Sequence, residues 1–187
     1  MTRTPASLLE RLRKAPDDGA WARFVELYTP LLYYWSRRVG LKQPDAADLV
    51  QDVFLLLVRK LPEFSYDRHK RFRSWLRTVT LNKWRENARR SDPLTQAATS
   101  ELPDLPGEDG AAQLWESEYQ QHVVGRALEL MQAEFEPSTW KAFWECAACE
   151  RPAREVAGEL GISVNAVYVA KSRVLGRLRQ ELDGLMD

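Results

Sequence analysis

Apolar residues in this chain recur at steps of three and four, and this spacing restricts the fold more than any other feature of the sequence. A helix has about 3.6 residues per turn, so apolar residues at these steps line one face of an amphipathic helix. Between residues 21 and 39 the series consists of Trp21, Phe24, Val25, Tyr28, Leu31, Leu32, Trp35 and Val39. Further segments repeat the pattern as far as residue 182, and we therefore predict an all-α fold.

Charge divides the chain into three parts. Residues 1–90 carry 19 Lys or Arg residues against 10 Asp or Glu residues, whereas residues 91–118 carry seven acidic residues and no basic one. The remainder is close to balance, with 8 basic and 10 acidic residues. The acidic part begins with a stretch rich in Pro, Gly, Ser and Thr, which is typical of a flexible linker. We predict two small helical domains, 1–90 and 118–187, joined by a flexible acidic linker at 91–117.

The best-delimited helix of the first domain is predicted between Pro44 and Pro62. Pro44 and Asp45 form a start signal, and Pro62 stops the run. A helical wheel places five apolar residues on one face: Val50, Val53, Phe54, Leu57 and Leu61. Leu55 and Leu56 fall among carboxylates on the opposite face, where an apolar pair is typical of a docking surface. The alternative is that this pair packs against another helix of the same domain.

Basic residues are concentrated between residues 65 and 90, where nine Lys or Arg residues stand against two acidic residues. Thr78, Thr80 and Asn82 interrupt the helical pattern, so a helix, a loop and a second helix are predicted. Cations hold phosphates, and exposed aromatic or amide side chains take an unstacked base, so the segment suits a nucleic-acid strand. The alternative is a solvated basic face with Trp75 and Trp84 in the core. For Trp75 we favour the core, and for Trp84 both interpretations stay open.

The C-terminal part contains the spacing of a helix-turn-helix. Its predicted helices cover residues 118–134, 138–149, 152–160 and 163–182. Ala157 is small where the last two helices cross, Gly161 allows the turn, and Val167 packs the second helix back on the first. A plain helical hairpin with solvated charges is the alternative.

The wheel of the last helix separates an inner face from an outer face. The inner face is formed by Val164, Val167, Val174, Leu175, Leu178 and Leu182. The outer face is formed by Asn165, Val169, Ser172, Arg173, Gly176 and Arg179. On that outer face Arg173 suits guanine, Asn165 suits adenine and Val169 can meet a thymine methyl group. Phosphate contacts are predicted for Lys171, Arg177 and Arg179.

Cys146 and Cys149 form a CxxC motif, which places both thiols on one helical face and suits a redox pair or half of a metal site. A zinc site needs two more ligands, and His69 and His122 lie in other segments. No βαβ pattern surrounds the motif, as a thioredoxin-like site requires, so we favour two small helix residues. No phosphate-binding glycine loop, nucleophile elbow or His/Glu metal spacing is present in the sequence. We expect no catalytic site, no metal and no cofactor.

No stretch of the sequence approaches the roughly 20 apolar residues of a membrane span. The N-terminus is charged where a signal peptide needs an apolar run. Two cysteines three residues apart suit a reducing compartment. We therefore expect a cytoplasmic protein that does not insert into a membrane.

Three segments, in this order, resemble a bacterial RNA polymerase sigma factor of the extracytoplasmic-function type, the minimal two-domain class of the sigma-70 family. The helix that docks on the clamp helices of the polymerase β′ subunit resembles DAADLVQDVFLLLVRKLPEF. The segment that recognises and melts the minus-ten promoter element resembles RFRSWLRTVTLNKWRENARR, and the reader of the minus-thirty-five element resembles REVAGELGISVNAVYVAKSRVLGRLRQEL. The resemblance implies that residues 1–90 form sigma region 2 and residues 118–187 form region 4. It also implies a protein that binds core RNA polymerase and promoter DNA, directs initiation and catalyses nothing itself.

The resemblance implies roles for three sets of residues. The polymerase-binding set is Asp48, Gln51, Asp52, Leu55 and Leu56. The minus-ten set is Arg71, Arg73, Arg77, Thr80, Asn82, Lys83 and Trp84, with Asn82 on the asparagine of a loop that captures a flipped base. The minus-thirty-five set is Ser163, Asn165, Tyr168, Val169, Lys171, Ser172, Arg173 and Arg177. Many relatives place Lys-Ser-Arg directly after the valine matched by Val167, whereas Tyr168, Val169 and Ala170 intervene here.

The family is commonly held inactive by an anti-sigma protein, and the resemblance implies such a partner. The CxxC of this chain is not the zinc motif of those partners. A stand-alone helix-turn-helix regulator that binds its operator without polymerase is the alternative function, although it leaves Leu55, Leu56 and the basic first domain unexplained. A CxxC redox or metal sensor is a further alternative. Residues 1–19 have no predicted role.

Overall fold

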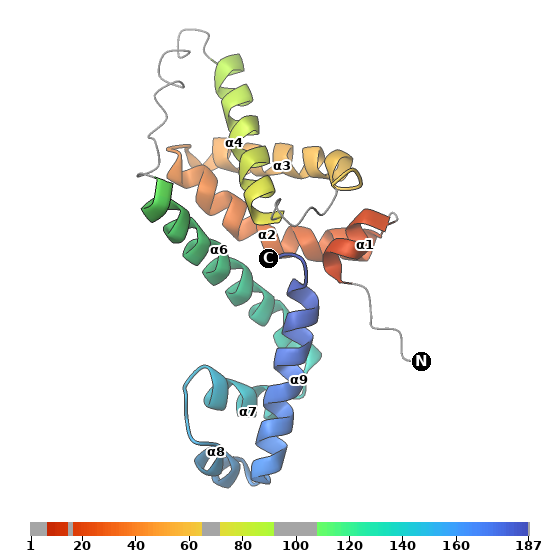
Figure 1. The fold of residues 1–187 in the computed structure, drawn as a ribbon, viewed down its shortest axis with the longest axis vertical. Coiled ribbons are helices and arrows are strands. Elements are labelled where there is room, and N and C mark those ends of the chain that lie inside the picture. The colour runs from red at the N-terminus through yellow and green to blue at the C-terminus, as the bar shows by residue number, and fades with distance from the viewer. Residues whose placement is uncertain (1–6, 15–16, 65–71, 92–107, 187) are drawn as a thin grey trace. The chain divides into compact units, whose positions relative to one another are not determined.

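The computed structural model describes residues 7–14, 17–64, 72–91 and 108–186. Each regular element within these ranges is a helix (Figure 1), which confirms the predicted all-α fold. None of the described helices combines the length and the apolar character needed to cross a membrane. The described residues form two compact units. We call residues 7–125 with 183–186 the large unit, and Arg126–Leu182 the small unit.

The large unit begins with helices that the sequence predicts in part. They are α1 (Leu8–Lys14), α2 (Asp18–Arg38), α3 (Gln43–Lys60) and α4 (Phe72–Ser91). The bounds of α2 and α3 confirm the helices predicted at 21–39 and 44–62, whereas α1 was not predicted. The Asp17 carboxylate caps α2 by accepting a hydrogen bond from the Ala20 backbone N–H at 2.8 Å. Leu8, Leu9 and Leu12 of α1 are buried, so this short helix helps to close the core.

The core of the large unit is formed where α2, α3 and α4 bury their apolar faces. Its residues include Phe24, Tyr28, Leu31, Leu32 and Trp35 of α2, Leu49, Val53 and Leu57 of α3, and Phe72, Leu76 and Val79 of α4. The rings of Phe24 and Phe72 lie edge to face, with centroids 6.2 Å apart. Phe54, which the wheel places on the inner face of α3, is only half-buried. This packing holds α3 and α4 together and leaves their polar faces for other contacts.

Helix α4 is continuous, so the predicted loop around Thr78 to Asn82 is wrong. The hydroxyl groups of Thr78 and Thr80 donate to the backbone carbonyl oxygens one turn earlier, each at 2.9 Å. These bonds satisfy the hydroxyls inside the helix, where they were expected to compete with it. Trp75 is half-buried at the edge of the core, where its ring packs against Phe64 with centroids 4.7 Å apart, so the favoured core position holds in part. Tertiary packing thus outweighs the weak helix propensity of this stretch.

Helix α6 (Glu108–Met131) begins ten residues before the predicted helix at 118–134, so the last part of the predicted linker is helical. Residues of α6 up to Gly125 belong to the large unit. Tyr119 is buried there, with its ring centroid 6.2 Å from that of Tyr28 and 6.5 Å from that of Trp35. The large unit therefore includes residues that the sequence assigned to the linker and to the second domain. Residues 92–107 of the predicted linker lie outside the described residues.

The small unit contains a helix-turn-helix. Its elements after α6 are η2 (Gln132–Glu134), α7 (Pro137–Ala147), α8 (Ala153–Leu160) and α9 (Val164–Leu182), as Figure 1 shows. Gly161 ends α8 in the left-handed conformation, with φ of 65°, and Ile162 N–H donates to the Ala157 oxygen at 3.0 Å. Ala157 and Val167 are buried in one apolar cluster. These contacts confirm the predicted helix-turn-helix spacing.

Arg151 lies between α7 and α8 and links the two helices. Its guanidinium donates to Glu145 Oε2 at 3.0 Å and to Glu159 Oε2 at 2.9 Å. The hydrogen bond to Glu159, and to a smaller extent the hydrogen bond to Glu145, raise the pKa of Arg151. The hydrogen bond from Arg151 in turn lowers the pKa of Glu159. This network holds α8 against α7 and so supports the position of α9.

Candidate functional site

The polar face of α3 borders a groove that α4 completes. The groove is lined by Leu41, Asp45, Asp48, Leu49, Gln51, Asp52, Trp84, Asn87, Ala88 and Arg90. Asp48 and Gln51 are exposed, whereas Asp52 is half-buried. The Asn87 side-chain amide donates to Asp52 Oδ2 at 2.7 Å, and this hydrogen bond links α4 to α3 across the groove. Three residues predicted to bind polymerase therefore lie together at one groove.

Leu55 has the most exposed large apolar side chain among the described residues, at 65%. Leu56 is half-buried, so of the predicted pair only Leu55 is exposed. The alternative that Leu55 packs inside its own unit does not hold. Val58 is also exposed and was not predicted, although its position three residues after Leu55 on a helix indicates a shared face. Leu55 and Val58 form an apolar surface that a protein partner can cover.

The predicted minus-ten residues do not share one environment. The half-buried members are Arg73, Arg77, Lys83 and Trp84. Asn82 is exposed, but it lies within a continuous helix rather than in a loop. Thr80 is only 3% exposed, and its hydroxyl is committed to the Leu76 carbonyl oxygen. Thr80 is therefore a core residue, which corrects its place among the surface contacts, and Arg71 lies outside the described residues.

Arg73 and Lys83 of this set are paired with carboxylates. The Arg73 guanidinium forms an ion pair with Glu116, and its Nη1 also donates to the Met186 main-chain oxygen at 3.2 Å. Lys83 Nζ lies 3.4 Å from Glu86 Oε2. The pair with Glu86 is partly exposed and weak. The Arg73 side chain is only 12% exposed, so its charge is directed toward the protein.

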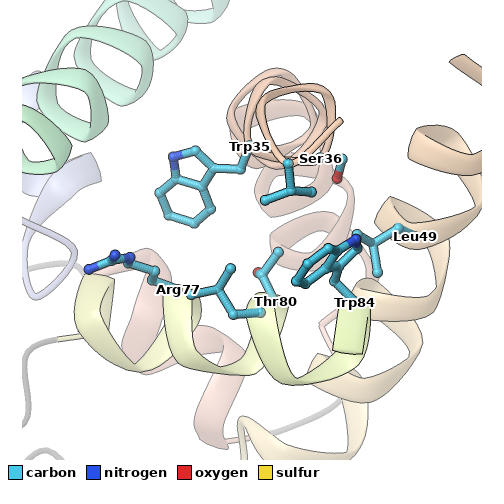
Figure 2. A pocket seen from close by; sticks show the side chains of 8 residues that line it. Trp35, Ser36, Leu49, Arg77, Thr80 and Trp84 are labelled. Carbon is cyan, nitrogen blue, oxygen red and sulfur yellow. The ribbon is translucent and has the colours of Figure 1, made fainter. Parts of the chain in front are cut away.

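An apolar cleft lies between α2, α3 and α4. It is lined by Trp35, Ser36, Val39, Leu49, Arg77, Thr80, Leu81 and Trp84. Figure 2 shows Arg77 and Trp84 on either side of Thr80 along α4, opposite Trp35 and Ser36 of α2. Burial lowers the pKa of Arg77, but a guanidinium stays protonated at neutral pH. Trp84, whose position the sequence left open, is half-buried and lines both this cleft and the groove.

The outer face of α9 is open to solvent in the small unit. All six residues predicted for that face are exposed: Asn165, Val169, Ser172, Arg173, Gly176 and Arg179. Tyr168 is 58% exposed, whereas Lys171 is half-buried. Ser163 caps the helix, because its Oγ accepts from the Ala166 backbone N–H at 3.1 Å. On the predicted inner face three residues are buried and three are half-buried, and none is exposed, so the predicted division of α9 into two faces is confirmed.

A hollow lies beside the first half of α9. It is lined by Ser138, Thr139, Ala142, Ile162, Ser163, Asn165, Ala166, Val169, Ala170 and Arg173. Asn165, Val169 and Arg173, the three residues predicted to read bases, all border it. Their four-residue spacing places them along one edge of the helix. An amide, an aliphatic group and a guanidinium in one row match the groups that bases display in the major groove.

Arg177, predicted to contact phosphate, is paired within the small unit. Its Nε lies 3.0 Å from Glu134 Oε2, and its Nη1 lies 2.6 Å from Glu181 Oε2. Burial acts to lower the pKa of Arg177, but the two carboxylates outweigh burial and raise it. Arg177 therefore links α9 to η2, and the exposed Arg173 is the more accessible of the two cations.

The two cysteines differ in environment. Cys146 is half-buried and packs against the apolar cluster of the helix-turn-helix, whereas Cys149 is exposed and lies beyond the end of α7. Both thiols are free. Within the described ranges, no group of three or more His, Cys, Asp or Glu residues could hold a metal ion. The packing of Cys146 agrees with the favoured structural interpretation.

Comparisons with known proteins point to one family. The Sigma-70 region 2 model matches residues 24–93, which include most of α2 and all of α3 and α4. The chain is 30% identical over 178 residues to RNA polymerase sigma factor CnrH of Cupriavidus metallidurans, and the match covers 91% of this chain and 88% of CnrH. It is 33% identical over 78 residues to RNA polymerase sigma factor NccH of Alcaligenes xylosoxydans, covering 42% of this chain and 41% of NccH.

A solved structure of CnrH in complex with the cytosolic domain of CnrY covers 91% of this chain and 92% of its own chain. The sequence identity in that superposition is 21% and the TM-score is 0.38. The relationship to the sigma factors rests on the sequence match to CnrH, which covers 91% of this chain and so extends through both units.

Proposed function

Because the chain belongs to the RNA polymerase sigma factors of the extracytoplasmic-function type, within the sigma-70 family, we propose how its two units share the work of initiation. The chain directs transcription initiation and is not an enzyme. In our proposal the large unit binds core polymerase and the minus-ten element, and the small unit binds the minus-thirty-five element. The observation that carries this proposal is the 30% identity to CnrH over 178 residues, through both units.

The polymerase-binding surface in this proposal is the exposed face of α3. Leu55 and Val58 supply apolar area, and Asp48 and Gln51 supply polar groups at the neighbouring groove. A central apolar contact surrounded by polar groups is the usual composition of a protein interface. The expected partner element is the pair of clamp helices in the β′ subunit. We expect the protein to act in the cytoplasm, where it can meet core polymerase.

The minus-ten surface in this proposal is on α4. Asn82 offers an exposed amide, and Trp84 offers a half-buried ring two residues further on. An amide can hydrogen-bond the edge of an unstacked base, and an aromatic ring can stack on it. Arg73, Arg77 and Lys83 supply positive charge for the phosphates of the opened strand.

The minus-thirty-five surface in this proposal is the outer face of α9. Arg173, Asn165 and Val169 border the hollow next to α7 and carry base recognition, with Tyr168 and Ser172 exposed beside them. In this proposal Ser163 and Lys171 contact the DNA backbone next to the same helix. Arg177 has a smaller role than the sequence implied, because Glu134 and Glu181 already hold its guanidinium.

A protein partner that restrains the factor is also part of the proposal. CnrH has been solved in complex with the cytosolic domain of CnrY. The feature of this chain that favours such a partner is the exposed apolar surface of Leu55 and Val58, because a partner protein can cover such a surface. A regulator that covers this surface would compete directly with core polymerase.

The test is a binding measurement between core RNA polymerase and the full chain. Leu55→Asp introduces a charge at the proposed contact, and we expect binding to weaken about tenfold or more, because central apolar contacts often cost 2 kcal/mol or more when lost. Val25→Asp is the matched control, since Val25 is a 37% exposed valine on α2. Equal binding by Leu55→Asp and wild type, with both folded by circular dichroism, would remove α3 from the polymerase interface.

A further inference from the structure

The residues after α9 pack on the large unit and reach Arg73. The Met186 main-chain oxygen accepts from Arg73 Nη1 at 3.2 Å, and the Glu116 carboxylate of α6 pairs with the same guanidinium. Arg73 thus has two acceptors, and neither belongs to its own helix. The Arg73 side chain is 12% exposed, so an anion from outside the protein has little access to its guanidinium. One of the cations proposed for the minus-ten strand is covered by the chain itself.

The covering segment is fixed by buried contacts. Leu185 is fully buried, and its carbonyl oxygen accepts from the Tyr119 hydroxyl at 2.8 Å. The Tyr28 and Tyr119 oxygens are 2.6 Å apart. A hydroxyl has one proton to donate, and that of Tyr119 goes to Leu185, so Tyr28 donates to Tyr119. This chain of two buried hydroxyls ends on the C-terminal segment and ties it to the core.

Gly184 lets the segment turn toward that position. Its φ is 75°, a conformation that favours glycine, and a Cβ at Gly184 would lie 3.2 Å from Leu9 Cδ2. The close approach gives α1 a role that the sequence did not reveal, because Leu9 is buried beneath the turn. The turn at Gly184, the burial of Leu185 and the hydrogen bond to the Leu185 carbonyl oxygen together indicate that this segment has a specific position on the large unit.

A second ion pair holds the first part of α6 against α2 within the large unit. Glu118 pairs with Arg38, and its Oε1 accepts from the Tyr34 hydroxyl at 3.1 Å. The Glu118 side chain is 15% exposed. Glu116 is therefore presented to Arg73 from a helix that is itself anchored. The planar guanidinium binds carboxylate and phosphate in the same manner, so Glu116 occupies the place that a DNA phosphate could take.

We propose that Glu116 and residues 184–186 form a latch that covers Arg73 in the free protein and must open before Arg73 can bind the promoter strand. The inference rests on the proposed role of α4 in minus-ten binding. Opening need not leave a charge without a partner, because a DNA phosphate replaces the carboxylate on Arg73. Such an exchange is more favourable than removal of one member of a half-buried ion pair.

The experiment compares the full chain with two variants that weaken the latch in different ways. Glu116→Gln removes the charge and keeps the shape, and deletion of residues 184–187 removes the segment itself. Glu129→Gln is the matched control, since Glu129 lies on the same helix and pairs with Arg126. Two quantities are measured: the rate at which phenylglyoxal modifies Arg73, by peptide mass spectrometry, and the affinity for a fluorescent single-stranded DNA of mixed sequence.

We expect both quantities to rise about three- to fivefold in the two latch variants and to stay at the wild-type level in Glu129→Gln. Addition of Arg73→Gln should cancel the gain in DNA affinity. Unchanged reactivity of Arg73 in folded Glu116→Gln overturns the latch. Raised reactivity with unchanged DNA affinity also overturns the inference. In that case the latch opens, but Arg73 does not bind single-stranded DNA, so the proposed role of Arg73 is wrong. If the deletion variant does not fold, Glu116→Gln alone decides the outcome.

Discussion

The two proposed DNA-binding helices differ in how much of their surface is available. On α9 the three residues proposed to read bases are exposed and lie in one row beside a hollow. On α4 Arg73 is covered, Thr80 is in the core and Trp84 lines a narrow apolar cleft. A row of exposed side chains suits recognition of an intact duplex. A partly covered surface suits a strand that becomes available only after the duplex opens.

The difference has a physical origin in how each helix is supported. One face of helix α9 is buried against α7 and α8, and the residues of its outer face are exposed and do not contribute to that packing. Helix α4 lies among α2, α3 and the first part of α6, so several of its polar side chains complete contacts within the unit. If the proposed roles hold, the covered surface of α4 must rearrange before it binds DNA, whereas the outer face of α9 is already exposed in the free protein.

The largest effect is expected from a charge in the core of the helix-turn-helix. Val167 is fully buried, and Val167→Asp should cost several kcal/mol, because an unpaired carboxylate is placed in an apolar cluster. Transcription that depends on the minus-thirty-five element should be lost, while polymerase binding by the large unit remains. Val169→Asp, two residues further on and 39% exposed, is the matched control and should leave the melting temperature nearly unchanged. Equal melting temperatures for the two variants would contradict the assigned faces of α9.

A smaller effect should separate the two arginines of α9. Arg173→Ala should cost about 1 to 3 kcal/mol at one base position of the promoter, because it removes a base contact. Arg177→Ala should change promoter affinity less, since Glu134 and Glu181 already hold that side chain. Competition assays with single-base promoter variants measure both effects. A uniform loss over all promoter sequences in Arg173→Ala would make Arg173 a phosphate contact instead.

The next prediction concerns strand opening. Asn82→Ala removes an exposed amide from α4 and should leave closed-complex formation unchanged while reducing the open complex, by about 1 kcal/mol for one lost base contact. Permanganate reactivity of thymines in the melted region measures the open complex. Unaltered reactivity in the variant would exclude Asn82 from base capture, and weaker closed complexes would place it on the duplex.

The smallest effect is a difference in acid stability within the small unit. The hydrogen bond from Arg151 lowers the pKa of Glu159 below its ordinary value of 4.5 in the folded state. The pair therefore stabilises the fold above that ordinary pKa, and this contribution is lost as the pH falls through the lowered, folded-state pKa. We expect the melting temperature of Glu159→Gln to decline less than that of wild type on acidification. Glu155→Gln is the control, since the Glu155 carboxylate lies 4.0 Å from Arg151. An equal decline in wild type and both variants would contradict a role for the pair.

The sequence predicted α9 well and α4 poorly. The structure of α9 depends on residues close together in the sequence, whereas that of α4 depends on contacts with residues far away in the sequence. The faces of α9 follow from one periodic pattern, and Gly161 and Val167 mark its turn and its core contact within the same segment. The loop predicted near Thr80 follows from local propensity, which the core contacts of α4 outweigh. The cover on Arg73 depends on Glu116 and Met186, which are distant in sequence, and a short apolar run such as α1 shows no clear period. Long-range contacts of this kind cannot be inferred from spacing alone.

The most direct test of the proposed division between the units is transcription from a library of promoter fragments by core polymerase, with and without the purified protein. We predict specific transcripts that are absent with core polymerase alone and whose promoters share two sequence blocks, one for each unit. Loss of selection at the upstream block in Arg173→Ala alone should link that block to α9. No polymerase-dependent transcript, together with operator binding by the protein alone, would contradict the proposal and favour a stand-alone regulator.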